Sequence, residues 1–355
     1  EKEVKAKDQQ MISGVSIPIY WLSNWIWDMF SYQFTAWLLI IIIVSLPDTD
    51  RLSKGDALGA TIALFLLLAP GITSFTYLQC FFLNKSTAAQ IVVLFTTFIT
   101  GLILTIVGTV LRLINSTSDI YVNHLRVLFC LFPPFAIGDG LLNLAVIDFL
   151  SFTELGGSKK YNPFDWKITG LNLVMLVVVG VGYFILTIVI DYLLARGIIQ
   201  QYITTMTVQI PEDHTERDED VQAEDIRVSS GSATQDSSIL LNEVKKVYGT
   251  GKYAVKGVSL GIPIGECFGL LGVNGAGKTS LLSILSGQNT PTAGTITLGG
   301  YDLFSNLHRC RQNIGYCPQF DALFDLLSAR QHLTLYAKMK GIKPKDIAKE
   351  VEAKL

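Results

Sequence analysis

A glycine-rich loop that ends in a lysine and a hydroxyl is the stretch of this chain whose residue types point most directly to chemistry. The loop covers residues 272–279 and follows the pattern G-x-x-x-x-G-K-[ST], in which backbone amides surround a chain of phosphates. The apolar run at 267–271 predicts a preceding strand that is buried on both faces. Apolar residues at helical spacing over 281–285 predict a helix directly after the loop.

Binding of an anion explains why these residue types occur at this spacing. Glycines let the backbone adopt positive φ angles, and inward N–H groups together with a helix N-terminus supply partial positive charge. We expect Lys278 to reach the β- and γ-phosphates of a nucleotide, Thr279 to bind Mg²⁺ and Ser280 to lie next to the α-phosphate. A glycine turn that binds nothing is disfavoured, because the loop and its flanking elements agree. The residues expected to contact the nucleotide here are Gly272, Val273, Asn274, Gly275, Ala276, Gly277, Lys278, Thr279 and Ser280.

The composition indicates that much of the chain lies in a membrane. Of the 355 residues 50% are hydrophobic and 16% are charged, and the net charge is −2; soluble domains carry about 25% charged residues. No basic stripe suggests nucleic acid as a partner. The five cysteines form neither a zinc pattern nor a disulfide framework. Because the sequence has neither an initiator Met nor a secretory signal, we interpret it as a fragment of a longer protein.

Four apolar runs are each long enough to cross the hydrocarbon core of a bilayer, which takes about 20 residues. A core helix of a soluble protein would not stay uncharged on every face over that length. The runs define a helical membrane domain over residues 17–195, in which Pro70 is expected to kink the second span. The predicted spans are 17–47, 57–83, 88–111 and 168–194.

A fifth apolar region, residues 125–150, is broken by Pro133-Pro134 and by Gly138-Asp139-Gly140. Its pieces are too short to span, and they predict a re-entrant helical hairpin. Four spans then leave residues 1–16 and the C-terminal part on the same, cytosolic side. This topology places Asn115 outside as a candidate glycosylation acceptor. We interpret Asp28, which lies among three tryptophans, as an interfacial anchor, with a role inside the membrane as the alternative.

The remaining residues predict a cytosolic linker and a globular domain. Residues 196–238 are acidic and then rich in serine, which predicts a disordered tether, with regulatory phosphorylation as the less favoured reading. Globular sequence follows at 239–355, and Ser328 with Gln331 predicts a helix capping box. Strands are expected at 239–244, 255–262, 294–298 and 313–317. The fold class is therefore a multi-pass α-helical membrane domain followed by an α/β phosphate-loop domain.

Two further residues connect the phosphate loop to a known family. Tyr248 precedes the loop, and Gln319 follows it in Tyr316-Cys317-Pro318-Gln319-Phe320. From the residues alone, these are a strand tyrosine and a loop glutamine. In this order with the phosphate loop, they resemble an ATP-binding cassette domain. The resemblance implies that Tyr248 stacks on adenine, and that Gln319 contacts Mg²⁺ and links the nucleotide state to the membrane domain.

The finer resemblance is to subfamily A of these transporters, the lipid-transporting branch. Residues 265–279 and 313–322 resemble its second cassette, and residues 132–141 and 162–166 resemble its outer-leaflet hairpin. The resemblance implies ATP-driven lipid transport, with ATP bound between this cassette and a second one from another part of the polypeptide. It also implies that the segment 1–16 couples the two domains by docking near 319–327.

Two departures from the family pattern affect what can be transferred to this chain. Asp139 stands where related sequences often carry a basic residue, which argues against a headgroup role there. No signature motif, no strand that ends in Asp-Glu and no switch histidine follows Gln319. Residues 239–355 therefore resemble the N-terminal part of a cassette, and we expect Lys278 and Gln319 to act in catalysis only in the complete protein. The alternatives are an ATP-gated channel or membrane regulator, a transporter of a non-lipid substrate, and a membrane-tethered module with a degenerate site.

Overall fold

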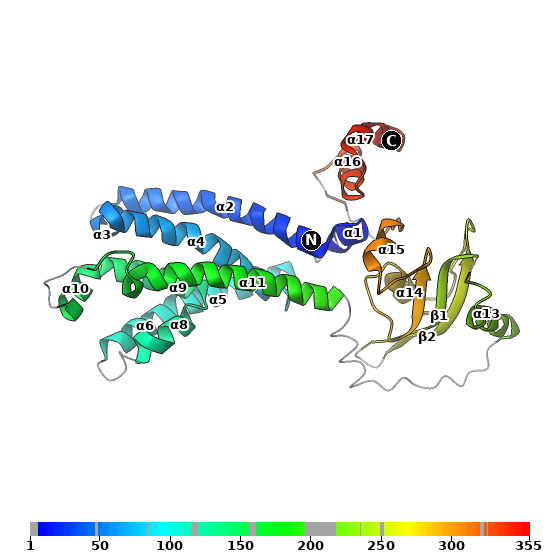
Figure 1. The fold of residues 1–355 in the computed structure, drawn as a ribbon, viewed down its shortest axis with the longest axis horizontal. Helices are drawn as coiled ribbons and strands as arrows, with labels where there is room; N and C mark the ends of the chain where they lie inside the picture. The colour runs from blue at the N-terminus through cyan, green and yellow to red at the C-terminus, as the bar shows by residue number, and fades with distance from the viewer. Residues whose placement is uncertain are drawn as a thin grey trace. The chain divides into compact units, whose positions relative to one another are not determined.

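The computed structural model describes residues 6–46, 49–83, 85–114, 120–155, 161–195, 218–234, 236–248, 252–319, 323–324 and 326–355. The chain divides into two compact units (Figure 1). The membrane unit is Tyr20–Val189, and the cassette unit combines Glu1–Ile19 with Ile190–Leu355. Asn115 and most of the predicted linker lie outside the described residues.

Four helices of the described chain are long and apolar enough to cross a membrane, and they lie at the positions of the four predicted spans. The first two are α2 (Ile17–Ser45) and α4 (Gly55–Cys80), with the short α3 (Asp50–Ser53) before α4. The third consists of α5 (Ser86–Phe98), the π-helical turn η1 (Ile99–Ile103) and α6 (Leu104–Leu113). The fourth consists of the π-helical turn η3 (Trp166–Gly170) and α11 (Leu171–Ala195).

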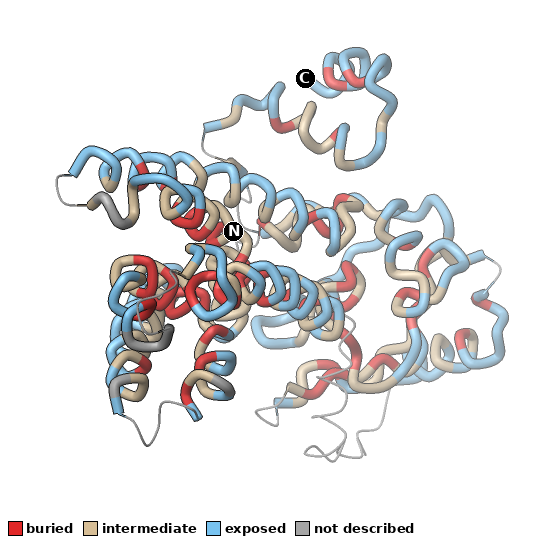
Figure 2. The backbone as a smooth tube through the Cα atoms, turned by 60° about the vertical axis from the view of Figure 1, so that its left-hand side comes forward, coloured by how far each residue is buried: buried red, intermediate tan, exposed pale blue. Residues whose placement is uncertain are grey.

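Apolar side chains cover the outside of the spans as well as their contacts. Phe30 and Phe34 of α2 are 72% and 79% exposed, as expected for a surface that faces lipid or other helices. Buried positions gather where the helices meet, and pale exposed positions run along the helices elsewhere (Figure 2). Ala36 and Ile40 of α2 pack against Phe65 of α4.

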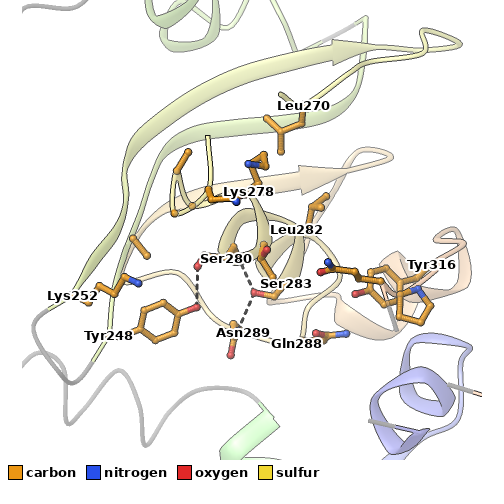
Figure 3. Close-up of a pocket in the computed structure, with 18 of the residues that line it drawn as sticks. Tyr248, Lys252, Leu270, Lys278, Ser280, Leu282, Ser283, Gln288, Asn289 and Tyr316 are labelled. Carbon is orange, nitrogen blue, oxygen red and sulfur yellow. Dashed lines mark hydrogen bonds between the residues drawn. The ribbon is translucent and has the colours of Figure 1, made fainter. Parts of the chain in front are cut away.

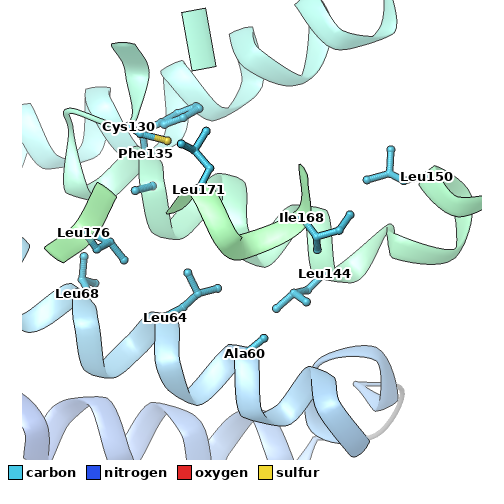
Figure 4. Packing of buried hydrophobic residues seen from close by; sticks show 11 residues of the cluster. Ala60, Leu64, Leu68, Cys130, Phe135, Leu144, Leu150, Ile168, Leu171 and Leu176 are labelled. Carbon is cyan, nitrogen blue, oxygen red and sulfur yellow. The ribbon is translucent and has the colours of Figure 1, made fainter. Parts of the chain in front are cut away.

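The main core of the membrane unit lies between α4, the hairpin region and the start of α11. Leu64 and Leu68 face Leu144, Ile168 and neighbouring residues in one buried cluster (Figure 4). Helix α4 continues through Pro70, and α11 approaches it closely there. A Cβ on Gly180 would lie 3.0 Å from the backbone nitrogen of Gly71, so this approach depends on glycine.

The region predicted as a re-entrant hairpin forms a series of short helices. These are the π-helical turn η2 (Tyr121–Leu125), α8 (Arg126–Phe129), α9 (Pro133–Ala145) and α10 (Ile147–Leu155). Pro133 and Pro134 occupy the first turn of α9, where the missing N–H groups leave no helical bond unmade. None of the four is long enough to cross a bilayer alone.

A buried polar network joins this hairpin to the start of the fourth span. The guanidinium of Arg126 donates to the Asp139 carboxylate at 2.9 Å, to the Ile168 carbonyl at 2.8 Å and to the Asn172 side-chain oxygen at 2.7 Å. Asn172 and Asn143 also donate to Asp139, both at 3.0 Å. Asp139 therefore compensates the charge of Arg126, which explains an acidic residue here within the protein itself.

The cassette unit contains a four-stranded antiparallel sheet in the order β2-β1-β3-β4. Its strands are β1 (Ser237–Val247), β2 (Tyr253–Pro263), β3 (Ala293–Leu298) and β4 (Tyr301–Asp302). Leu241 of β1 pairs with Leu260 of β2 and Ile296 of β3. Three predicted strands are thus confirmed, and α14 (Lys278–Leu285) packs Leu281 and Ile284 into the same core.

Two predicted strands are wrong. Residues 267–271 and 313–317 form no strand, and Leu271 is 92% exposed. A strand that is buried on both faces needs paired neighbours on its edges. The described part of the chain supplies none for either segment, because its sheet consists of β1 to β4 alone.

The prediction of disorder is also wrong for residues 219–229, which form helix α13 (Glu219–Ser229). The helix docks on the edge strand β2, with Val228 only 4% exposed. Glu224 accepts a hydrogen bond from the Gly261 N–H, and Arg227 donates to the Gly261 carbonyl, each at 2.8 Å. These contacts stabilise a helix that its acidic composition alone would leave unfolded.

Four short helices complete the described part of the cassette unit. Helix α1 (Ala6–Ile12) lies in its N-terminal segment, and α15 (Leu307–Gln312) follows β4. Helix α16 (Ala329–Met339) begins with the capping box of Ser328 and Gln331, which confirms that prediction. Helix α17 (Pro344–Glu352) packs Ile347 and Val351 against α16.

Candidate functional site

A cavity of about 1180 Å³ in the cassette unit contains most of the residues predicted to bind nucleotide. Its wall includes Tyr248, the loop and helix start from Asn274 to Ser280, and Gln319. Figure 3 labels Tyr248, Lys278 and Ser280 among these residues. Gly272 and Val273 begin the loop and are exposed, but they do not line this cavity. The structure therefore brings the aromatic residue, the phosphate loop and the glutamine to one space.

The phosphate loop depends on glycine where it enters helix α14. Gly277 has a φ of 89°, in the left-handed region that other residues rarely adopt. A Cβ at this position would also lie 2.2 Å from the Ala254 carbonyl oxygen on β2. The close contact with β2 aims the first turn of α14, and its N–H groups, at the cavity.

Lys278 lies back across the loop that precedes it. Its ammonium group donates to the carbonyls of Gly272 and Val273, the second at 2.8 Å. The positive charge is thus held beside the loop amides, in the region where a phosphate chain would lie.

Tyr248 is connected to the phosphate-loop helix by its hydroxyl, which donates to the Ser280 hydroxyl at 3.1 Å (Figure 3). The buried ammonium of Lys246 lies over the Tyr248 ring, 5.3 Å from its centre. Burial lowers the pKa of the Lys246 ammonium. Sequence reasoning missed Lys246, because a lysine within a strand normally indicates an exposed position.

Other cavity residues carry no sequence signature. Lys252 lies beside Tyr248, and Gln288 and Asn289 follow α14. The Asn289 amide donates to the Ser283 hydroxyl at 2.9 Å, which holds the end of α14 against the loop that follows. These residues are recognised only from their place around the cavity.

The oxygen-bearing side chains of the cavity suit a hard cation that also binds phosphate. Thr279 and Gln319 both line the cavity and each carries a side-chain oxygen, the kind of ligand that Mg²⁺ prefers. No cluster of three His, Cys, Asp or Glu side chains that could hold a metal occurs among the described residues. A magnesium ion here would therefore take its remaining ligands from phosphate and water.

Helix α1 contacts the segment that contains Gln319. The Gln9 side chain donates to the Tyr316 carbonyl at 3.2 Å, and Gln9 lines the same cavity. The Lys7 ammonium forms an ion pair with Asp191 at 2.7 Å. Much of the predicted docking region, residues 320–322 and 325, lies outside the described residues.

Comparisons with known proteins match both the membrane part and the cassette part of the chain to protein families. A family model described as "ABC-2 family transporter protein" matches residues 1–189, and one described as "ABC transporter" matches residues 255–355. The chain is 36% identical over 98% of its length to the retinal-specific phospholipid-transporting ATPase ABCA4 of Mus musculus. It is 36% identical over 99% to ATP-binding cassette sub-family A member 2, and 33% identical over 98% to phospholipid-transporting ATPase ABCA7, both of Homo sapiens.

The chain spans only 15%, 14% and 16% of the length of these three relatives. The two family models nevertheless cover most of the chain, and their order agrees with its four membrane-capable helices and its phosphate loop. The relatives that it resembles are named as members of sub-family A or as phospholipid-transporting ATPases, and the chain itself belongs to the ABC-2 family of transporter proteins, with a multi-pass membrane domain followed by an ABC transporter domain.

Proposed function

We propose that this chain is part of an ATP-driven transporter that moves phospholipid across or out of a membrane. The supporting observation is the cavity in which Tyr248, the phosphate loop and Gln319 meet, in a chain that also carries four membrane-capable helices. Two of the relatives are named as phospholipid-transporting ATPases, which supports phospholipid as the substrate class.

Different residues of the cavity bind different parts of ATP. The adenine ring stacks on Tyr248, and loop amides together with Lys278 neutralise the triphosphate. Lys278 must exchange its present bonds to Gly272 and Val273 for phosphate oxygens, which it can do by rotating its flexible side chain. This exchange keeps the ammonium paired in both arrangements.

Thr279 and Gln319 would hold Mg²⁺ in this site. The ion supplies neutralisation of charge on the phosphates during hydrolysis. Because Gln319 lies three residues after Tyr316, where α1 makes its contact through Gln9, a shift of Gln319 can be passed to α1. We therefore propose that the segment 1–16 couples the cassette to the membrane domain.

Hydrolysis requires a second cassette as a partner, supplied by another part of the full-length polypeptide. Within the present sequence, no strand that ends in Asp-Glu and no signature motif follows Gln319. We therefore propose that these 355 residues alone bind MgATP without turning it over. Hydrolysis by the isolated polypeptide that is lost in Lys278→Met would contradict this part of the proposal.

The test of the proposed function uses the full-length protein in liposomes of defined phospholipids. We expect ATPase activity to rise with its phospholipid substrate, labelled phospholipid to move when ATP is added, and both to be lost in Lys278→Met. Ion conductance that ATP opens, without lipid movement, would show a gated channel instead. ATPase activity that no phospholipid changes would count against the lipid substrate.

A further inference from the structure

We propose that Lys246 is a positioning residue for nucleotide binding, which supports the ring of Tyr248 from the face turned away from ATP. The inference rests on the proposed ATP site and adds a residue that no phosphate-loop motif includes. Lys246 is only 2% exposed, although its side chain carries an ammonium group. A buried charge of this kind is unfavourable unless nearby groups compensate it.

Two groups compensate the Lys246 ammonium. It donates to the Thr290 carbonyl at 2.6 Å, and it lies 5.3 Å from the centre of the Tyr248 ring. That second distance is within the range in which a cation is attracted to an aromatic face. The Lys246 ammonium therefore interacts both with the loop that follows α14 and with Tyr248, the aromatic residue of the cavity.

Further bonds fix the same strand end to that loop. The Val247 N–H donates to the Thr292 hydroxyl at 2.9 Å, and the Thr292 N–H donates to the Lys245 carbonyl at 2.7 Å. The hydroxyl of Tyr248 donates to Ser280 on α14. The Tyr248 N–H also donates to the Lys252 carbonyl at 2.9 Å, so Tyr248 is held at its backbone, at its hydroxyl and at its ring. Tyr248 lines the cavity and Lys246 does not, so we assign the ring face away from Lys246 to the ligand.

The position of the cation has a consequence for stacking. A positive charge on one face withdraws electron density from the ring, and the opposite face then stacks better on an electron-rich base such as adenine. Lys246 therefore acts on ATP affinity through Tyr248. It does not contact the phosphates, so the rate of hydrolysis at saturating ATP should not depend on it.

The experiment measures KM and kcat for ATP in the full-length protein, with substrate phospholipid present. Lys246→Met removes the charge at similar length, and we expect KM to rise about three- to tenfold while kcat stays within about twofold. The matched control is Lys245→Met, the adjacent lysine, whose ammonium lies 3.7 Å from Glu243. We expect its KM to equal that of the unmodified protein.

A double-mutant cycle tests whether Lys246 acts through the ring. In a Tyr248→Leu background, Lys246→Met should raise KM no further; an equal additional rise would overturn the proposal. Lys246→Gln, which keeps a donor for the Thr290 carbonyl but carries no charge, serves as the second variant if the methionine variant does not fold. It should also raise KM, and an unchanged KM would overturn the role of the charge.

Failure of the proposed function gives a different result. If Lys278→Met retains normal ATP binding, the assigned nucleotide site itself is wrong. If Lys278→Met loses binding while Lys246→Met and Lys246→Gln keep the original KM, only the inference about Lys246 is overturned.

Discussion

Removing the charge of Asp139 tests whether the polar network of the membrane unit holds the hairpin in place. Asp139→Asn preserves the shape of the side chain but leaves the Arg126 guanidinium, which is 3% exposed, without its counter-ion. Breaking a buried ion pair by changing one partner costs about 3–5 kcal/mol. Because an asparagine oxygen can still accept some of the hydrogen bonds, we expect the lower end of that range.

Cys130 offers a local reporter for this variant. Its thiol is fully buried and lies 3.9 Å from the Asn172 side chain, within the same network. Alkylation of Cys130 therefore requires the hairpin to separate from the start of the fourth span. A loss of about 3 kcal/mol raises the open population, and hence the alkylation rate, by about 100-fold.

The assay uses the full-length protein in lipid nanodiscs and follows alkylation of Cys130 by mass spectrometry. Asp56→Asn, an exposed acid in the first turn of α4, is the control and should leave the rate unchanged. Replacing both charges, as in Arg126→Met with Asp139→Leu, should recover part of the protection. An unchanged rate in Asp139→Asn alone would refute the reasoning.

Three further predictions concern the cassette unit. Gly261→Ala should loosen α13, because a Cβ there would lie 2.9 Å from the Arg227 guanidinium and displace it from the Gly261 carbonyl. Hydrogen exchange over residues 219–229 should then accelerate, and unchanged protection would contradict this docking. The hydrogen bond from Arg227 lowers the pKa of Glu224 in the folded protein. The stabilisation that Glu224 gives α13 is therefore complete above the ordinary glutamate pKa of 4.5 and is lost as the pH falls through the lower folded pKa. Glu224→Gln should abolish this release of α13 by acid, and an equal release in that variant would argue against Glu224. Gln9→Cys should cross-link to the native Cys317 in a nucleotide-dependent manner, since Gln9 donates to the neighbouring Tyr316 carbonyl; absence of the cross-link in every nucleotide state would remove α1 from the coupling path.

The parts of the fold that could be predicted from sequence are those whose signal is local. A span needs only an uncharged run of sufficient length, and the phosphate loop needs glycines, a lysine and a hydroxyl at fixed positions. The Ser328 capping box is likewise contained within one turn. The membrane-capable helices, the helix that follows the phosphate loop and the capping box are present in the structure because no distant residue decides them, whereas the binding role of the loop stays a prediction.

The errors occurred where distant residues decide the structure. The 267–271 segment has strand composition, but a buried strand also requires neighbours, and none of the described segments pairs with it. The acidic sequence of α13 gives no sign that Glu224 and Arg227 together hold Gly261, 37 and 34 positions away. Likewise, the sequence shows Asp139 only as a departure from a family pattern, because it does not reveal that Arg126 is its partner.

Photolabelling of the full-length protein with 8-azido-ATP tests the central claim most directly, because it locates the base and depends on the phosphate loop. We expect the label on the peptide that contains Tyr248, protection of that peptide by excess MgATP, and its loss in Lys278→Met. Labelling of this peptide that persists in Lys278→Met, or that excess MgATP does not prevent, would contradict the assignment of residues 272–280 as the phosphate-binding loop.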